Sequence, residues 1–227
     1  MSLRVLVVDD QGVVRAGFAA VIDAEEDMTV VGEAGDGAGA VRLAAELTPD
    51  VVVMDVRMPD LDGIAATRII TGRENAPRVL VLTTFDLDAY VFDALRAGAS
   101  GLLFKDVRST ELLCGIRVVA AGDSVLTPSA TRRLIGHYAS GAGPGFRAGS
   151  GPREPDSLTG RERYVLTLVA SGLDDAEIAG QLGTTVGTVT SHVNALLRTL
   201  GLRDRVQATI LAYDLGLARP NLPGTHI

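Results

Sequence analysis

Five polar side chains stand where apolar, strand-like runs of the sequence stop. They are Asp9, Asp10, Asp55, Thr83 and Lys105. The clearest case is Val51–Met54, four apolar residues that run directly into Asp55. The carboxyl ends of the strands in an open α/β sheet meet at one rim, and such folds bind their ligands there. We therefore expect these five side chains to lie in a single site.

This set of side chains suits the transfer of a phosphoryl group. Three carboxylates that lie together repel one another unless a cation sits among them, and they favour a hard, oxygen-seeking ion such as Mg²⁺. Lys105 is the only lysine among 21 basic residues, and its ammonium offers a compact charge to a phosphoryl oxygen. Thr83 offers a hydroxyl. The pattern predicts that Asp55 accepts the phosphoryl group while Mg²⁺ and Lys105 neutralise its charge.

Strand-like runs alternate with helical spacing through the first half of the chain. The expected strands are Leu3–Val8, Met28–Ala34, Asp50–Met54, Arg78–Leu82 and Ser100–Phe104. The expected helices are Gly12–Ala24, Ala38–Leu47, one that Asp62-Gly63 opens and that runs through Ile69, Asp86–Ala97, and one from Ser109 to near Gly122. The alternation predicts an α/β fold, a flavodoxin-like, doubly wound, five-stranded parallel sheet.

The composition changes after this alternating region. Residues 1–123 hold 20 acidic and 11 basic residues, whereas residues 124–227 hold 8 acidic residues and 10 arginines. Residues 140–152 have the Gly-, Ala- and Ser-rich composition of a flexible linker. We expect a first domain over 1–123, a linker over 124–156 with a helix near 128–139, a second domain over 157–219, and a tail over 220–227.

The second domain is predicted to be all helix. Thr159 and Glu162 have the spacing of a capping box, and the helix that they open is expected to end at Gly172. Three further helices are expected over Asp174–Leu182, Val186–Leu200 and Arg203–Leu215. Two helices joined by a tight glycine turn, the second one longer and polar on its outer side, are typical of a helix-turn-helix.

The whole of 1–123 resembles the receiver domains of bacterial two-component response regulators. The resemblance is carried by Asp9-Asp10, Asp55 with Met58-Pro59 and Asp62-Gly63 after it, Thr83, and Gly98-Ala99-Ser100-Gly101 before Lys105. It implies that a histidine kinase phosphorylates Asp55, and that Thr83 and Lys105 contact the phosphoryl group. It also implies a Mg²⁺ site made by Asp10, Asp55 and the Arg57 backbone carbonyl, with Asp9 acting through water.

One position departs from this family. Leu102 stands three residues before the lysine, where the family usually has an aromatic residue. We expect the phosphorylation chemistry at Asp55 to be retained, and the usual coupling between Thr83 and an aromatic side chain to differ.

Residues 158–218 resemble the LuxR/NarL-type helix-turn-helix, so the chain is similar to response regulators of the NarL/FixJ family. The matching motifs are Leu158–Arg163, Ala176–Ala179 and Gly187–Val193. The resemblance implies that the helix at 186–200 enters the major groove of double-stranded DNA. The residues expected to contact DNA are Thr188, Thr190, Ser191, Asn194, Arg198, Arg203 and Arg205, with Arg161 and Arg163 also on the backbone. The family usually has Lys where this chain has Thr190, which predicts weaker attraction to phosphates and a gentler dependence on salt.

These features predict a response regulator in which phosphorylation of Asp55 controls dimerisation and transcription-factor activity. We expect no enzymatic activity beyond self-phosphorylation from small donors and self-dephosphorylation. One alternative is a LuxR-type regulator that acts independently of phosphorylation. Another is a dinucleotide-binding enzyme that uses the Gly35-Gly37-Ala40 loop, which fits G-x-G-x-x-A but follows the second strand rather than the first.

The sequence also indicates where the protein works. Met1-Ser2-Leu3-Arg4 leads into the first expected strand without a signal peptide, and no apolar run approaches the roughly 20 residues of a membrane span. We expect a cytoplasmic protein with no membrane partner. The single cysteine, Cys114, excludes a disulfide framework, and it is expected to be a buried small hydrophobe.

Overall fold

The computed structural model describes residues 2–84, 88–126 and 158–217. The chain divides into two compact units, Met1–Thr131 and Arg132–Ile227, and each is described by itself. The predicted helix near 128–139, the tail over 220–227 and all but the first residues of the predicted linker lie outside the described residues.

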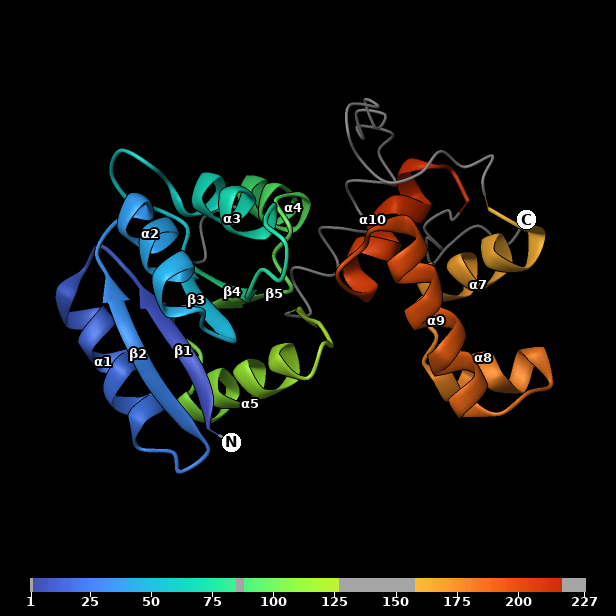
Figure 1. Ribbon diagram of the computed structural model, residues 1–227, viewed down its shortest axis with the longest axis horizontal. Coiled ribbons are helices and arrows are strands. Elements are labelled where there is room, and N and C mark those ends of the chain that lie inside the picture. The colour runs from blue at the N-terminus through green and yellow to red at the C-terminus, as the bar shows by residue number, and fades with distance from the viewer. Residues whose placement is uncertain (1, 85–87, 127–157, 218–227) are drawn as a thin grey trace, which may run out of the picture. The chain divides into compact units, whose positions relative to one another are not determined.

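The first unit is built on a parallel sheet. Its strands are β1 (Leu3–Val8), β2 (Met28–Ala34), β3 (Val51–Asp55), β4 (Arg78–Thr83), β5 (Gly101–Phe104) and β6 (Val125–Leu126). They lie in the order β2-β1-β3-β4-β5-β6, and every neighbouring pair is parallel (Figure 1). The five predicted strands and their flavodoxin-like order are confirmed. The sheet also extends through β6 into the segment that we assigned to the linker.

Helices cover both faces of this sheet. They are α1 (Gly12–Asp23), α2 (Gly37–Leu47), α3 (Gly63–Thr71), α4 (Asp88–Arg96) and α5 (Ser109–Ala120). α1 and α5 lie on one face, and α2, α3 and α4 lie on the other (Figure 1). Under α1 and α5, Ile22 and Ile116 pack against alternate strand residues such as Val53 and Leu82. Because both faces are covered, β3 and most of β1, β4 and β5 read as continuous apolar runs rather than as alternating ones.

Acidic caps fix where two of these helices begin. The Asp36 side chain accepts a hydrogen bond from the Gly39 amide at 2.6 Å and starts α2. The Asp62 side chain accepts one from the Ala65 amide at 2.7 Å and starts α3. Each cap satisfies an amide that the first turn of a helix leaves without a partner. The caps therefore fix the point at which the loop after β2 and the loop after β3 each enter a helix.

The prediction that Cys114 is buried was wrong. Cys114 is exposed, whereas Leu113 and Gly115 on either side of it are buried. Each residue of a helix is rotated by about 100° from the previous one, so one position within an apolar run can still face water. The sequence showed that α5 contains an apolar run but not which of its residues face the core.

The second unit is a small helical domain. Its described helices are α7 (Gly160–Ala170), α8 (Asp175–Leu182), α9 (Val186–Leu200) and α10 (Arg205–Asp214), as predicted. The core residues Leu166, Ile178 and Leu196 join three of these helices. The predicted capping box of Thr159 and Glu162 is present. Gly183 ends α8 at a positive φ of 62°, a conformation that favours glycine and permits the tight turn into α9.

None of the helices in the described parts of the chain has the length and apolar character needed to cross a membrane.

Candidate functional site

The carboxyl ends of four strands bring the predicted site residues together. Asp55 is the last residue of β3, and Asp9 directly follows β1. Asp55 lies beside Leu82 in the sheet register, which places Thr83 one position further along β4. The Thr83 carbonyl accepts a hydrogen bond from the Lys105 amide at 2.8 Å, just beyond the end of β5. The parallel topology therefore gathers these residues at one rim, as expected.

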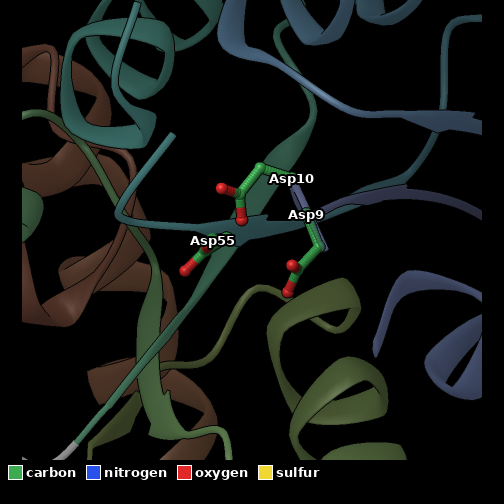
Figure 2. A group of neighbouring side chains, drawn as sticks. All are labelled: Asp9, Asp10 and Asp55. Atoms are coloured by element: carbon green, nitrogen blue, oxygen red, sulfur yellow. The ribbon is translucent and has the colours of Figure 1, made fainter. Parts of the chain in front are cut away.

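Asp9, Asp10 and Asp55 form one acidic pocket. Each offers a carboxylate oxygen, and these oxygens lie within 4.8 Å of one another. Figure 2 shows the three side chains at the ends of β1 and β3. Asp9 and Asp55 are buried, whereas Asp10 is exposed. A set of carboxylate oxygens that is open to solvent on one side suits a hard divalent cation such as Mg²⁺, which keeps several of its waters.

Lys105 is held between two of these carboxylates. Its Nζ lies 2.7 Å from Asp9 Oδ2 and 2.9 Å from Asp55 Oδ2, and only 12% of its side chain is exposed. The only lysine in the sequence therefore extends into the pocket rather than into solvent. One ammonium facing three carboxylates leaves the pocket with an excess of negative charge, which a divalent cation would offset.

The pocket changes the proton affinity of its members. Burial of Asp55 raises the pKa of its carboxyl, and the neighbouring Asp9 charge adds to this, although Lys105 and the Arg57 amide act in the opposite direction. Burial works against the charged form of Lys105, but the hydrogen bonds that its ammonium donates to Asp9 and Asp55 outweigh burial and raise the pKa of the ammonium. Lys105 therefore stays charged at neutral pH, whereas the charge of Asp55 carries a penalty.

Arg15 is a site residue that sequence reasoning missed. Its guanidinium donates to the Asp9 backbone carbonyl at 2.7 Å, and it also pairs with Glu33 of β2 at 3.2 Å. It therefore ties the end of β1 to α1 and β2 beneath the acidic pocket. No motif marks Arg15, because in the sequence it is one arginine of an amphipathic helix, and only the sheet order brings Glu33 beside it.

Two glycines hold the loop that follows Asp55. A Cβ on Gly63 would overlap the carbonyl oxygen of Asp55, and the Gly63 amide donates to the Val56 carbonyl at 2.9 Å. A Cβ on Gly37 would overlap the carbonyl oxygen of Leu61 in the same loop. The G-x-G-x-x-A stretch thus contains a glycine that close backbone packing requires, which explains it without a nucleotide.

Gly63→Ala is expected to destabilise the first unit by about 3 kcal/mol or more, because the added methyl group must displace backbone atoms of Asp55. Gly17→Ala is the matched control. Gly17 lies inside α1 with no atom within 4 Å of a built Cβ, so alanine should stabilise by about 0.5–1 kcal/mol. Urea unfolding measures both. Equal stability of the two variants would contradict the close approach of Gly63 to Asp55.

Leu102 is fully buried in β5, beside Val81 of β4. Two residues later, Phe104 stands beside Thr83 in the register and is 6% exposed. Residues two apart on a strand share a face, so Leu102 and Phe104 lie on the same side of the sheet. The aromatic residue that pairs with Thr83 in the sheet register is therefore Phe104, whereas position 102 holds a leucine.

In the second unit, α9 presents part of the predicted DNA-contacting set on one exposed face. Ser191, Asn194 and Arg198 are exposed and lie at helical spacing. The opposite face of α9 is buried and consists of Val189, Val193, Leu196 and Leu200. Thr188 is partly buried, and its hydroxyl lies 2.9 Å from that of Thr185. The core thus fixes which side of α9 remains available to a partner.

Two other predicted DNA contacts, Thr190 and Arg205, are engaged within the domain. The Thr190 hydroxyl donates to Asp175 at 2.5 Å, and Arg205 pairs with the same carboxylate at 2.6 Å. Arg203 is only partly exposed. Sequence reasoning missed Asp175, because it stands next to the capping residue Asp174 and resembles a second acid in the first turn of α8.

A groove lies between the start of α7 and the middle of α9. It is lined by Thr159, Arg161, Glu162, Val165, His192, Ala195 and Leu196. Arg161 of α7 and His192 of α9 therefore line the same groove.

Both units match known protein families. Residues 5–117 match the response regulator receiver domain, and residues 156–212 match the LuxR family of bacterial regulatory proteins. The two matches follow the two compact units of the structure.

Full-length relatives carry the same two parts. The DNA-binding transcriptional activator DevR/DosR of Mycobacterium tuberculosis is 36% identical over 219 residues, which cover 96% of this chain and 97% of that one. The transcriptional regulatory protein LiaR of Bacillus subtilis is 36% identical over 211 residues, covering 93% and 97%. The solved structure of ChrA, a response regulator of a heme-sensing two-component system, matches with a TM-score of 0.52 and 33% identity over 95% of this chain and 98% of its own. The chain therefore belongs to the DNA-binding response regulators of two-component systems, with a receiver domain followed by a LuxR-type helix-turn-helix domain.

Proposed function

We propose that this chain is a transcription factor whose activity is switched by phosphorylation of Asp55 by a histidine kinase. The observation that carries the proposal is the contact of Lys105 Nζ with Asp55 and Asp9, at 2.9 and 2.7 Å, within a pocket of three carboxylates at the rim of the sheet. An aspartate that merely lies on an exposed loop would not need a buried lysine and two further carboxylates beside it. A carboxylate held beside a cation and a second acidic group is suited to accept and hold a phosphoryl group.

In the proposed transfer, an oxygen of the Asp55 carboxylate forms a bond to phosphorus. The bond from phosphorus to the histidine nitrogen of the kinase, or to the leaving oxygen of a small phosphodonor, breaks and its electron pair stays with the leaving group. Lys105 then donates to a phosphoryl oxygen, and the Thr83 hydroxyl donates to another. Self-phosphorylation from small donors and self-dephosphorylation by water use the same site.

The donor set of the pocket fits Mg²⁺. We propose that Asp10, Asp55 and the backbone carbonyl of Arg57 hold the ion, with Asp9 acting through water. When bound, Mg²⁺ supplies positive charge next to the transferred group. The rest of the neutralisation comes from Lys105, which already lies between Asp9 and Asp55.

Phosphorylation adds up to about two negative charges to this pocket. Lys105 is shared between two carboxylates in the unphosphorylated chain, and a phosphoryl group would compete for it. We propose that the resulting change at the ends of β4 and β5 promotes formation of a homodimer, which places two α9 helices one turn of double-stranded DNA apart. Ser191, Asn194 and Arg198 would then read base edges and phosphates. The DNA partner puts this function in the cytoplasm.

The test is the intact mass of the full chain after incubation with acetyl phosphate and Mg²⁺, for wild type and Asp55→Ala, with DNA retention and oligomeric state measured on the same samples. Wild type is expected to gain one phosphoryl group, to dimerise and to bind DNA more tightly, and Asp55→Ala is expected to do none of these. A gain of mass without any change in DNA binding would favour a regulator that acts independently of phosphorylation. The burial of a leucine at position 102 is the observation that makes this the second candidate.

A further inference from the structure

One carboxylate in the DNA-binding domain holds groups from two other helices. Asp175, the first residue of α8, accepts a hydrogen bond from the Thr190 hydroxyl of α9 through Oδ2 at 2.5 Å. Its Oδ1 pairs with Arg205 Nη1, at the start of α10, at 2.6 Å. The other Nη of Arg205 donates to the Leu173 carbonyl at 2.6 Å. Both Thr190 and Arg205 belong to the set expected to contact DNA.

Capping of α8 does not require Asp175. The neighbouring Asp174 is the N-cap, and its side chain accepts from the Glu177 amide at 2.8 Å. Glu177 closes the capping box by accepting from the Asp174 amide at 2.8 Å. The side chain of Asp175 is therefore free for contacts outside its own helix, and it makes them with α9 and α10.

The pair of Asp175 and Arg205 is partly shielded from water. The exposed fractions of the two side chains are 22% and 31%. Burial raises the pKa of Asp175, but the hydrogen bonds from Thr190 and Arg205 outweigh this and leave the pKa below its ordinary value. Asp175 is therefore ionised at neutral pH and cancels the charge of Arg205.

This cancellation matters because the domain has few cations to give to DNA. Residues 158–217 contain five arginines, no lysine and six acidic residues. On α9 itself, Arg198 is the only charged residue. Attraction to DNA phosphates rises with each cation that can reach them, so the engagement of one arginine out of five changes the domain's response to salt.

The contact with Asp175 also determines whether the Thr190 hydroxyl can donate or accept a hydrogen bond on the exposed side of α9. The Thr190 hydroxyl has a single proton, and two acceptors compete for it: the nearer Asp175 carboxylate at 2.5 Å and the Val186 carbonyl at 3.1 Å. Its oxygen is left with lone pairs only. An acceptor on the exposed side of α9 matches the amino groups that adenine and cytosine present in the major groove, and it does not match the carbonyl oxygens of guanine and thymine.

We propose that Asp175 is a positioning residue that determines how this domain reads DNA: it withholds Arg205 from the DNA backbone and makes Thr190 an acceptor that selects adenine or cytosine. The inference rests on the proposed placement of α9 in the major groove. It implies that the low charge of the domain is used to reduce binding to DNA of any sequence, while the preference at one base position is retained.

The first test is the salt dependence of binding to a fluorescent duplex of mixed sequence, with the full chain treated with acetyl phosphate and Mg²⁺. Asp175→Asn keeps a side chain of the same shape and removes the charge. It is expected to bind more tightly at low salt and to lose about threefold more affinity than wild type between 50 and 200 mM salt, which corresponds to one added phosphate contact. Adding Arg205→Gln to Asp175→Asn should return the slope to that of wild type.

Glu177→Gln is the control for net charge, because it removes one negative charge from the same helix while a glutamine can still accept the hydrogen bond from the Asp174 amide. Its slope should equal that of wild type. The second test is selection from a randomised duplex pool, in which wild type should prefer adenine or cytosine at one position. Thr190→Val should lose that preference, and Asp175→Ala should weaken it, because the more distant Val186 carbonyl, 3.1 Å from the Thr190 oxygen, is then left to accept its proton.

The proposal requires both the change in salt dependence and the change in base preference. An unchanged salt slope in Asp175→Asn, or an unchanged base preference in Asp175→Ala, would overturn the proposal. Damage to the fold lowers affinity, so it cannot produce the tighter, more salt-sensitive binding that is expected. If wild type and all variants fail to bind any duplex, the placement of α9 in the groove fails, and the role of Asp175 fails with it.

Discussion

Asp55→Asn is expected to raise the unfolding temperature of the receiver domain in the presence of a chelator, although it removes the proposed phosphoacceptor. Burial of Asp55 and the neighbouring Asp9 charge raise the pKa of the carboxyl above its value in the unfolded chain. The folded state therefore disfavours the ionised form, and a neutral amide of the same shape removes this penalty. Each kcal/mol of relieved penalty raises the midpoint of a domain of this size by about 4 °C.

The sign of the pH dependence follows from the same shift. A carboxyl whose pKa is raised on folding destabilises the fold at pH values above its folded pKa, where it must ionise in the pocket. This penalty decreases as the pH falls toward the unfolded value of about 3.9 and is absent below it. The stability difference between Asp55→Asn and wild type should therefore be full at neutral pH and vanish in acid. Thermal unfolding at several pH values, without divalent ions, measures it.

Mg²⁺ should reverse the order of the two proteins. An ion that binds only the folded state stabilises it by about 2.7 kcal/mol at one hundred times its Kd, and the wild-type pocket with its three carboxylates should gain this. Asp55→Asn and Asp10→Asn should gain little. A higher midpoint for wild type than for Asp55→Asn in chelator would contradict the electrostatic account of the pocket, and equal shifts with Mg²⁺ in all three proteins would contradict the proposed ion site.

The rim of the sheet could be predicted from the sequence because topology alone creates it. Apolar runs that each end in a polar residue, separated by helices, permit few folds. In a parallel sheet the ends of β1, β3, β4 and β5 lie side by side, so Asp9, Asp55, Thr83 and Lys105 converge whatever their separation in sequence. The prediction needed only the position at which each strand ends, and a polar residue that follows a short apolar run marks that position.

The residues that the sequence did not reveal act through a single tertiary contact. Arg15 donates to the Asp9 carbonyl, and Asp175 pairs with Arg205. At each of these positions any polar residue would fit the hydrophobic pattern of the helix. Gly63 was recognised as part of a motif, but the overlap of its Cβ position with the Asp55 backbone depends on how the loop folds back. Hydrophobic periodicity carries no information on such polar contacts, because surface positions of a helix accept most polar residues equally.

Lys105→Met is expected to slow phosphoryl uptake by about 10²–10³-fold, the usual loss when one positioned donor to developing negative charge is removed. Lys105 Nζ contacts both Asp9 and Asp55, with 12% of its side chain exposed, so no solvent cation can take its place at the same distance. Lys105→Arg keeps the charge, but its planar, bulkier guanidinium cannot occupy the position of a compact ammonium between two carboxylates. It should recover only part of the rate.

The measurement is the initial rate of mass gain with acetyl phosphate and Mg²⁺, taken before hydrolysis of the phosphorylated form contributes. Arg108→Met is the matched control, since Arg108 is three residues away, is 86% exposed, and pairs only loosely with Glu111 at 3.7 Å. Its rate should equal that of wild type. If Lys105→Met took up phosphoryl groups as fast as Arg108→Met, Lys105 would serve only to hold Asp9 and Asp55 together. In that case Lys105→Met should lose stability but not rate, which its unfolding curve would show directly.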